Sequence, residues 1–334
     1  MSKVVEFKDI VPSKWESLVK ASSVATWFQT KEAFDFFDSL SFLKAFAFGV
    51  ERDGRLVGVV VGFIQKDGGK LKQYFSRRAI INGGPLLDDN ITDEELAMLL
   101  NALKSRLNRK TIFIEARNFN DYGRWRHVFE ACGFGYEPHY DVIVDTTSME
   151  SVGNRLDRNR RRNIKKANEN GLIIEQSVSD DDLYQFYQML NELYRSKVKT
   201  PLFPFEFFQK LKNLESARFF MAKDSEGKLV GGLVCLALES RIVHALFACG
   251  DDQNHKTLSP SVMVNYAGIC YAAEHGFSKF DFMGAGKPDD GGYGVRDFKL
   301  KFGGELVELG RFVHVCNRML FAVGKYGVKI MKKL

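Results

Sequence analysis

The sequence predicts a mixed α/β protein built from two copies of one structural unit. A six-residue pattern in the first half, DGRLVG at residues 53–58, recurs in the second half as EGKLVG at residues 226–231. Each copy lies between a strand that ends in charged residues and a long apolar strand. In both halves two helices come before this hairpin, and a helix and a strand follow it. The length of 334 residues also suits two domains of ordinary size.

Hydrophobic periodicity defines the elements of the first half. The strands are expected at residues 4–10, 45–50, 56–64, 111–115 and 139–144. The helices are expected at residues 12–21, 31–40, 92–107 and 122–132. Thr92 is expected to begin the third helix with a capping box to Glu95. Asp53-Gly54 is expected to close the hairpin, because this pair readily adopts the φ values of a tight turn.

The second half begins with a basic helix over residues 152–170, which Gly171 is expected to end. Further helices are expected at residues 180–197, 205–211 and 260–275. The strands are expected at residues 172–176, 219–223, 229–238, 241–248, 279–283 and 305–312. A basic amphipathic helix over residues 314–334 is expected at the C-terminus. The boundary between the two units is expected near residues 145–152.

Composition excludes several classes of protein. The hydrophobic fraction of 45% provides enough apolar material for two cores, which argues against disorder. No apolar run is long enough to cross a bilayer, and the first residues, MSKVVE, lack the apolar segment of a signal peptide, so a cytoplasmic protein is expected. The 5 widely spaced cysteines and 6 histidines fit neither a disulfide framework nor a metal site. The net charge of +6 permits an anionic partner without requiring one.

The strongest local signal for a site lies in the segment 280–304. A short apolar strand that contains one charge, Asp281, leads into a loop with five glycines: Gly284, Gly286, Gly291, Gly292 and Gly294. Glycine permits φ > 0 and close approach of the backbone to a ligand, so such a loop is typical of a binding site. A short helix with Phe298, Lys299 and Phe302 follows, in which the two phenylalanines share one face. A solvated loop with a basic rim is an equally good interpretation.

The basic helix of the second half is another candidate binding surface. It carries seven basic residues in a short span, with Asp157 as the opposing charge: Arg155, Arg158, Arg160, Arg161, Arg162, Lys165 and Lys166. Helical spacing places Arg158, Arg162 and one of the two lysines on one face. Such a face suits the phosphates of a nucleic acid or an anionic membrane surface. A solvated helix face is the other interpretation.

Four stretches of the chain together resemble a known family: residues 26–30 (TWFQT), 160–171 (RRRNIKKANENG), 280–284 (FDFMG) and 298–303 (FKLKFG). The hairpin with its flanking helices resembles the GNAT acyltransferase fold, a mixed central sheet flanked by helices. Two such units in tandem resemble the Fem family of non-ribosomal peptidyltransferases, which add amino acids from aminoacyl-tRNA to peptidoglycan precursors. The resemblance covers nearly the whole chain. It implies that the terminal helix packs on the first unit, which gives domains of residues 1–148 with 313–334, and of 149–312.

The resemblance implies a role for each candidate residue. Aminoacyl transfer requires an amine aligned with an ester carbonyl and a stabilised oxyanion. Lys299, which follows Phe298, is the candidate for the oxyanion, with Lys301 as the fallback; alternatively Lys299 lines the rim and holds substrate phosphate. Asp281 is expected either to orient a base or to cap the loop. The candidates for substrate binding are Arg195, Lys197, Lys199, Gly284, Gly286, Arg296 and Lys301. The candidates for tRNA phosphates are Arg158, Arg161, Arg162, Lys165 and Lys166.

The sequence departs from the patterns of these families at two places, and other functions therefore stay open. The family's lysine on the second helix is absent, and Phe36 and Phe37 lie there, which bears on the identity of the precursor. Neither hairpin is followed by the Q/R-x-x-G-x-G/A pyrophosphate signature, which disfavours acetyl-CoA. The alternatives are an acyltransferase that uses acyl-CoA or acyl carrier protein to modify a lipid or polysaccharide, and a non-catalytic protein that binds tRNA or a membrane surface.

The expected partners follow from the same resemblance. They are aminoacyl-tRNA as the donor and a nucleotide- or lipid-linked peptidoglycan precursor as the acceptor, with no metal and no resident cofactor; acyl-CoA is the alternative donor. The terminal helix carries four lysines that suit peripheral contact with the inner face of a membrane: Lys325, Lys329, Lys332 and Lys333. A soluble amphipathic helix is the other interpretation of this segment.

Overall fold

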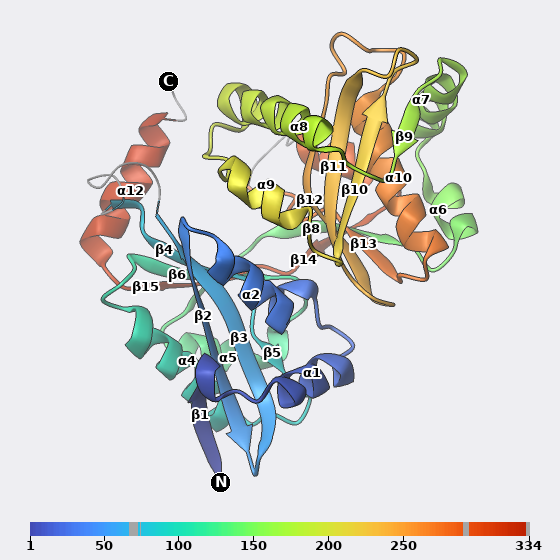
Figure 1. The fold of residues 1–334 in the computed structure, drawn as a ribbon. Helices are drawn as coiled ribbons and strands as arrows, with labels where there is room; N and C mark the ends of the chain where they lie inside the picture. Colours follow the sequence, from blue (N-terminus) through green and yellow to red (C-terminus); the bar gives the residue numbers. More distant parts are fainter. Residues whose placement is uncertain (67–72, 74, 290–293, 332–334) are drawn as a thin grey trace. The chain divides into compact units, whose positions relative to one another are not determined.

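The computed structural model describes residues 1–66, 73, 75–289 and 294–331. The chain forms two compact units, one of Met1–Pro138 with Leu309–Leu334 and one of His139–Glu308 (Figure 1). Each unit contains a mixed sheet with helices packed on it, so the predicted class of two tandem α/β units is confirmed. Within the described residues, no helix combines the length and the apolar character needed to cross a membrane.

The sheet of the first unit has the order β1-β2-β3-β4-β6-β15-β7, and β5 pairs with β3. Its strands are β1 (Ser2–Glu6), β2 (Leu43–Arg52), β3 (Arg55–Gln65), β4 (Arg78–Gly83), β5 (Leu86–Leu87), β6 (Phe113–Asn118), β7 (Gly135–Glu137) and β15 (Arg311–Val315). Its α-helices are α1 (Pro12–Ala21), α2 (Lys31–Ser39), α4 (Asp93–Leu107), α5 (Arg126–Ala131) and α12 (Arg318–Met331). Short 3-10 turns lie at η1 (Phe7–Asp9), η2 (Trp27–Gln29) and η3 (Gly123–Trp125).

Strand β3 supplies side chains to both faces of this sheet, because successive residues of a strand point in opposite directions. Val60 and Ile64 belong to the core that contains Leu99 of α4. Phe63 points to the other face, where its ring centroid lies 4.6 Å from that of Phe37 on α2. The long apolar run of β3 is therefore explained by burial on both faces.

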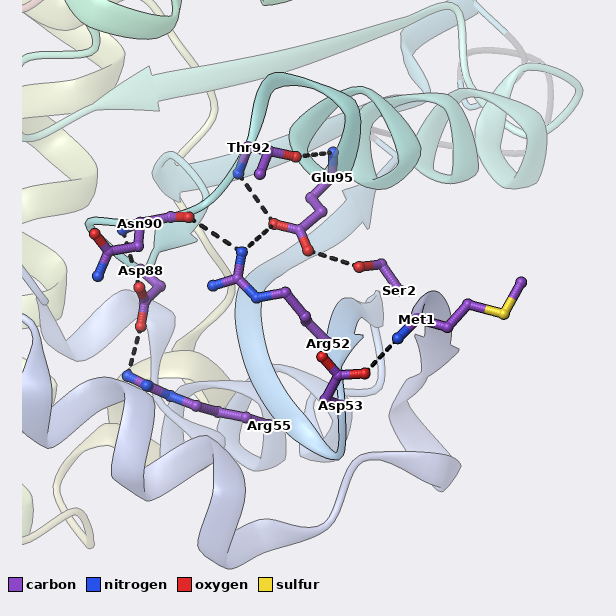
Figure 2. Close-up of polar contacts among 9 residues, drawn as sticks. All are labelled: Met1, Ser2, Arg52, Asp53, Arg55, Asp88, Asn90, Thr92 and Glu95. Atoms are coloured by element: carbon purple, nitrogen blue, oxygen red, sulfur yellow. Dashed lines mark hydrogen bonds and ion pairs between the residues drawn. The ribbon is translucent and has the colours of Figure 1, made fainter.

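Charged side chains connect the β2–β3 turn to the start of α4 (Figure 2). The predicted capping box is present, since the Thr92 amide donates to Glu95 Oε2 at 3.0 Å and the Glu95 amide donates to Thr92 Oγ1 at 3.3 Å. The same Oε2 accepts from Arg52 Nη1 at 3.1 Å, and Arg55 Nη2 donates to Asp88 Oδ2 at 2.7 Å. Glu95 is buried, so its charge is balanced within this network.

The sheet of the second unit has the order β14-β8-β13-β12-β11-β10-β9. Its strands are β8 (Tyr140–Asp145), β9 (Ile173–Glu175), β10 (Ala217–Lys223), β11 (Leu229–Leu238), β12 (Ile242–Gly250), β13 (Lys279–Asp281) and β14 (Glu305–Glu308). Its helices are α6 (Met149–Arg155), α7 (Arg158–Glu169), α8 (Asp180–Leu193), the π-helical turn η4 (Tyr194–Val198), α9 (Phe205–Leu211), α10 (Pro260–Glu274) and α11 (Gly294–Leu300). Helices α8 and α9 lie on one side of β10–β12 and α10 on the other (Figure 1).

Two predictions for this half are wrong. The basic helix expected over residues 152–170 is interrupted between α6 and α7, because Asp157 is the N-cap of α7 and its Oδ1 accepts from the Asn159 amide at 2.8 Å. The strand expected over residues 305–312 is two strands in two sheets, β14 and β15, separated at Gly310 with φ +67°.

The units divide after Pro138 and after Glu308, whereas the sequence-based boundaries lie after residues 148 and 312. Strand pairing accounts for the difference. Strand β8 pairs with β13 and β14 of the second unit, and β15 pairs with β6 and β7 of the first. The C-terminal helix α12 belongs to the first unit.

The repeated six-residue pattern is also a repeated structure. Gly54 and Gly227 occupy the same place in the two turns, and both have φ of +80°. In the first unit the pairing register shifts just before the turn, between Val50 and Glu51. In the second unit the shift lies between Ala222 and Lys223, at the equivalent position. Both hairpins therefore contain the same bulge and the same left-handed glycine, but the turns differ in length: Asp53-Gly54 joins the paired residues Arg52 and Arg55, whereas residues 224–228 join β10 to β11.

The two units differ at their parallel strand pair. In the first unit β4 and β6 pair from Ala79 to Gly83, the last residue of β4. Buried side chains then cover the end of β4: Gln29 Nε2 donates to the Gly83 carbonyl at 2.9 Å, and the Tyr122 hydroxyl donates to the same carbonyl at 2.9 Å. A Cβ on Gly84 would lie 2.6 Å from the Tyr122 hydroxyl, so this packing requires glycine. The parallel pair of the first unit is closed.

In the second unit the parallel ladder between β12 and β13 ends at the pair His244–Asp281. Strand β12 continues to Gly250, and in this part the described strand that pairs with it is β11. Leu246, Phe247 and Ala248 are only partly buried there. The divergence of two parallel strands leaves a strand edge next to the start of the glycine-rich loop.

Candidate functional site

The glycine-rich loop begins with a tight turn at the end of β13. Three of its residues have left-handed backbone conformations: Met283 with φ +53°, Gly284 with φ +86° and Gly286 with φ +81°. Glycine adopts these values without strain, which explains two of the five glycines. The left-handed Met283 is unusual for a residue with a side chain, and such conformations occur mainly at functional sites. Gly291 and Gly292 lie outside the described residues.

Backbone hydrogen bonds hold this turn against β8. The Phe282 amide donates to the Val142 carbonyl at 3.0 Å, and the Ala285 amide donates to the Tyr140 carbonyl at 2.6 Å. The Tyr140 amide in turn donates to the Gly286 carbonyl at 2.8 Å. The turn therefore extends the pairing of β8 beyond the end of β13.

Lys299 on α11 reaches into the same turn. Its Nζ donates to the Phe282 carbonyl at 2.7 Å and to the Gly284 carbonyl at 2.5 Å. An ammonium group has three N–H donors, so one donor is left for a ligand. Burial lowers the pKa of Lys299 to about 8, against the opposite effect of the Asp141 and Asp281 carboxylates. The group is therefore mostly charged at neutral pH and titrates close to it.

Asp281 lies beneath this turn and is fully buried. Its Oδ1 accepts from the Met283 amide at 2.7 Å, so it caps the loop, which is one of the two roles expected for it. Burial raises the pKa of this carboxyl to about 6, while the Met283 hydrogen bond and the nearby Lys299 and Lys279 act in the opposite direction. Its Oδ2 lies 3.8 Å from Nε2 of His244, a buried imidazole whose pKa burial lowers to about 3.

Helix α11 is anchored by aromatic and cationic contacts. Phe298 and Phe302 lie on one face with ring centroids 5.4 Å apart, as the spacing predicts. The guanidinium of Arg160 lies 4.4 Å from the Phe298 ring centroid and donates to the Phe298 carbonyl at 3.2 Å. Arg296 donates to the Ala285 carbonyl at 2.8 Å and so connects the helix to the loop. Phe298 thus fixes the helix that carries Lys299, while its catalytic role stays a prediction.

The structure brings only part of the predicted site together. Lys299, Asp281, Gly284, Gly286 and Arg296 meet at the turn, as described above. Arg195, Lys197 and Lys199 are exposed at the end of α8, in and just after the π-helical turn, and Arg195 pairs with Glu192 at 2.7 Å. Lys301 follows α11 and is exposed. The group at the end of α8 therefore belongs to a different element from the lysine.

The predicted phosphate-binding residues are on the surface of α7. Arg158, Arg162, Lys165 and Lys166 are exposed, and Lys165 lies 3.8 Å from Glu169. Arg161 donates to the Leu156 and Asn154 carbonyls at 3.1 Å, so part of its function is to hold the start of the helix. The side chains of Lys325, Lys329, Lys332 and Lys333 lie outside the described part of the terminal helix.

Sequence reasoning missed three residues of the site: Asp141, His244 and Arg160. Asp141 and Asp145 lie four residues apart in the apolar strand YDVIVD and so point to the same face, which was the available signal for a polar face. Arg160 was grouped with the exposed basic residues, yet it is buried against α11. Among the residues that the structure describes, no cluster of histidine, cysteine and carboxylate groups could hold a metal ion.

Comparison with known proteins identifies the fold. Residues 154–299 match the family model described as an acetyltransferase (GNAT) domain, and the match ends at Lys299. The crystal structure of FemX superimposes with a TM-score of 0.73 at 17% identity, over 96% of this chain and 99% of that chain. The chain has the tandem GNAT fold. The predicted structural resemblance to the Fem family is thereby confirmed.

Two other solved structures are also similar. A tandem GNAT protein from the clavulanic acid biosynthesis pathway has a TM-score of 0.60 at 11% identity, over 95% of this chain and 99% of that chain. The C-terminal domain of a putative lysylphosphatidylglycerol synthetase from Agrobacterium fabrum has a TM-score of 0.60 at 12% identity, over 96% of this chain and 95% of that chain. A comparison with curated proteins finds no match.

Proposed function

We propose that this protein is a Fem-type aminoacyltransferase, which moves an amino acid from aminoacyl-tRNA to an amine of a peptidoglycan precursor. The observation that carries the proposal is Lys299, whose ammonium is fixed on two carbonyls beside the open end of the β12–β13 pair. The second unit is the catalytic unit in this proposal. The full-length fold similarity to FemX supports the choice of reaction.

Aminoacyl transfer requires the enzyme mainly to align the amine with the ester carbonyl and to stabilise the oxyanion. The acceptor amine attacks the ester carbonyl carbon, and the carbonyl oxygen becomes negatively charged. Collapse of this intermediate breaks the bond to the ribose oxygen, and the proton that the attacking nitrogen loses passes, directly or through solvent, to that oxygen, which leaves as a hydroxyl. The remaining N–H of the Lys299 ammonium stabilises the oxyanion, and partial burial strengthens that interaction. Losing one such donor typically costs about 100-fold or more in kcat.

The start of α10 supports a donor other than acyl-CoA. In a GNAT unit the helix that follows the hairpin is where the pyrophosphate of the cofactor would bind, because free amides at a helix N-terminus attract anions. Here the Ser261 amide donates to the Asp252 carboxylate at 3.2 Å, and Pro260 provides no amide hydrogen. Asp251 adds a second carboxylate to the same loop. Negative charge at this position opposes a pyrophosphate.

A second candidate function is acyl transfer to a lipid. The family model that matches residues 154–299 describes an acetyltransferase, and one similar structure carries the name of a putative lysylphosphatidylglycerol synthetase. The first observation fits an acyltransferase, and the second favours a lipid headgroup as its acceptor. The third candidate, a non-catalytic protein that binds tRNA or a membrane surface, does not explain the fixed lysine.

The test is transfer of radiolabelled amino acids, charged on total tRNA, to an extract of cell-wall precursors. We expect label in the precursor with the wild type, a loss of about 100-fold or more in the rate with Lys299→Ala, and no transfer after the donor is treated with RNase. Lys228→Ala is the matched control, since Lys228 is an exposed lysine at the β10–β11 turn. It should retain the wild-type rate.

Parallel reactions distinguish the candidates. In one reaction labelled acyl-CoA replaces charged tRNA as the donor. In another, phospholipid vesicles replace the precursor extract as the acceptor. Absence of label from charged tRNA, with the protein folded, would refute the tRNA-dependent reaction, and consumption of acyl-CoA would establish the alternative donor. Binding of tRNA without turnover of any donor, unchanged in Lys299→Ala, would establish the non-catalytic function.

A further inference from the structure

Gly284 connects Lys299 to a second carboxylate. Its carbonyl accepts from Lys299 Nζ at 2.5 Å, and its amide donates to Asp141 Oδ1. Gly284 is thus bound by a carboxylate at its amide and by an ammonium at its carbonyl. The neighbouring Met283 amide is held in the same way by Asp281, at 2.7 Å. Two carboxylates and one ammonium therefore fix the three-residue turn 282–284 from opposite sides.

Strand pairing explains why Asp141 reaches this turn. Val142 and Val144 of β8 point into the hydrophobic core, so Asp141 points to the opposite face of the sheet. Asp281 pairs with Ile143 of the same strand and emerges on that same face. Asp141 is only 4% exposed, and a carboxylate this deeply buried requires compensation by hydrogen bonds and positive charge. The Gly284 amide and Lys299 contribute to this compensation.

We propose that Asp141 is a positioning residue for Lys299: by accepting the Gly284 amide, it fixes the Gly284 carbonyl on which the ammonium rests. Its charge also holds the lysine in the protonated form. Among the described residues, the other charged and titratable groups around the turn are Asp281 and Lys279 from β13, His244 from β12, His139 just before β8 and Arg296 from α11. Only the expected effect of Asp141 on catalysis depends on the proposed function. Its effect on the position and protonation of Lys299 does not.

Chemical labelling tests this inference without any substrate. Acetic anhydride reacts with the neutral amine, so the pH dependence of labelling at Lys299, measured by mass spectrometry, reports its protonation and exposure. The wild type should show a midpoint near pH 8. Asp141→Asn keeps the size of the side chain and removes its charge. It should lower the midpoint by about one pH unit or more and increase labelling at neutral pH.

Asp145→Asn is the matched control. Asp145 lies on the same strand and face, but its carboxylate accepts from the Thr147 amide at 3.0 Å and from Ser151 Oγ at 3.2 Å. Its replacement should leave the Lys299 midpoint at the wild-type value. An unchanged midpoint in folded Asp141→Asn would overturn the proposal.

A measurement on the wild type covers the case in which Asp141→Asn does not fold. Hydrogen exchange of the Gly284 amide should be slow, because this amide is bound to a buried carboxylate; exchange at the rate of a free amide would overturn the proposal. In the transferase assay, Asp141→Asn should move the alkaline loss of activity to lower pH by the same amount as the labelling midpoint. A moved midpoint without transfer from any donor would refute the proposed function and leave the role of Asp141 intact.

Discussion

Replacing Asp281 with asparagine should make the free energy of unfolding depend less on pH. Asp281 is fully buried, and burial raises the pKa of its carboxyl from 3.8 to about 6 in the folded protein. The unfolded chain ionises at the ordinary pKa, so the folded state holds an additional proton between these two values. Stability is therefore greatest below the unfolded pKa and is lost as the pH rises through about 6. The difference amounts to about 3 kcal/mol at neutral pH.

The assay is urea unfolding of the wild type and Asp281→Asn at about pH 4 and pH 7. The carboxamide oxygen can still accept from the Met283 amide, so the main change is the loss of the ionisable group. We expect the stability of the variant relative to the wild type to increase by about 2 kcal/mol between the two pH values, because at pH 4 the carboxyl of the unfolded chain is already partly ionised.

Asp145→Asn provides a control of opposite sign. Hydrogen bonds from Thr147 and Ser151, together with Arg155, lower the pKa of the Asp145 carboxyl. Its contribution to stability is present above the unfolded pKa and is lost as the pH falls. Removing it should therefore destabilise the protein more at pH 7 than at low pH. If the free energies of unfolding of Asp281→Asn and the wild type differed by the same amount at both pH values, the assignment of Asp281 as a buried, destabilising carboxyl would be refuted.

Three further substitutions test the surroundings of the site. Gly303→Ala should lower the free energy of unfolding by about 2 kcal/mol or more in urea titrations, because Gly303 has φ +83° and its Cβ would lie 2.6 Å from the Arg155 carbonyl oxygen; a loss below about 0.5 kcal/mol would contradict this geometry. Tyr122→Phe should cost about 1–3 kcal/mol by thermal or chemical unfolding, since it removes a buried donor from two carbonyls, and transfer activity should be unaffected. Arg160→Met should keep the protein folded by circular dichroism but increase labelling of Lys299, because α11 loses the contact between Arg160 and Phe298; wild-type labelling would show that α11 is held by other contacts.

Local signals in the sequence predicted much of the fold. The capping box of α4 and the glycine after α7 depend on residues a few positions apart, so single-sequence reasoning finds them. Gly171 has φ +76°, the conformation that its place at a helix end requires. The repeated hairpin was visible because both copies need a left-handed glycine at the same place before the second strand, Gly54 and Gly227. The i, i+4 pair Phe298 and Phe302 was found for the same reason.

The boundaries and the carboxylates of the site depend on contacts between distant residues. Strand β8 is adjacent in sequence to the first unit, but its partners β13 and β14 come more than a hundred residues later. Nothing local to Asp141 reveals that Gly284 lies beside it. Arg160 likewise has the sequence environment of a solvated helix, and only the aromatic face of α11 explains its burial. Long-range pairing therefore decides both the division of the chain and the composition of the site.

The closed strand pair of the first unit has a consequence for stoichiometry. Gln29 and Tyr122 occupy the end of β4, where the second unit has a diverging strand and a lysine. The two units thus share a bulged hairpin and differ at the end of their parallel strand pair. A reactive donor analogue should modify each polypeptide once, in the second copy alone, although the molecule contains two related halves. Under the proposed function the protein would therefore have one reaction centre for each chain.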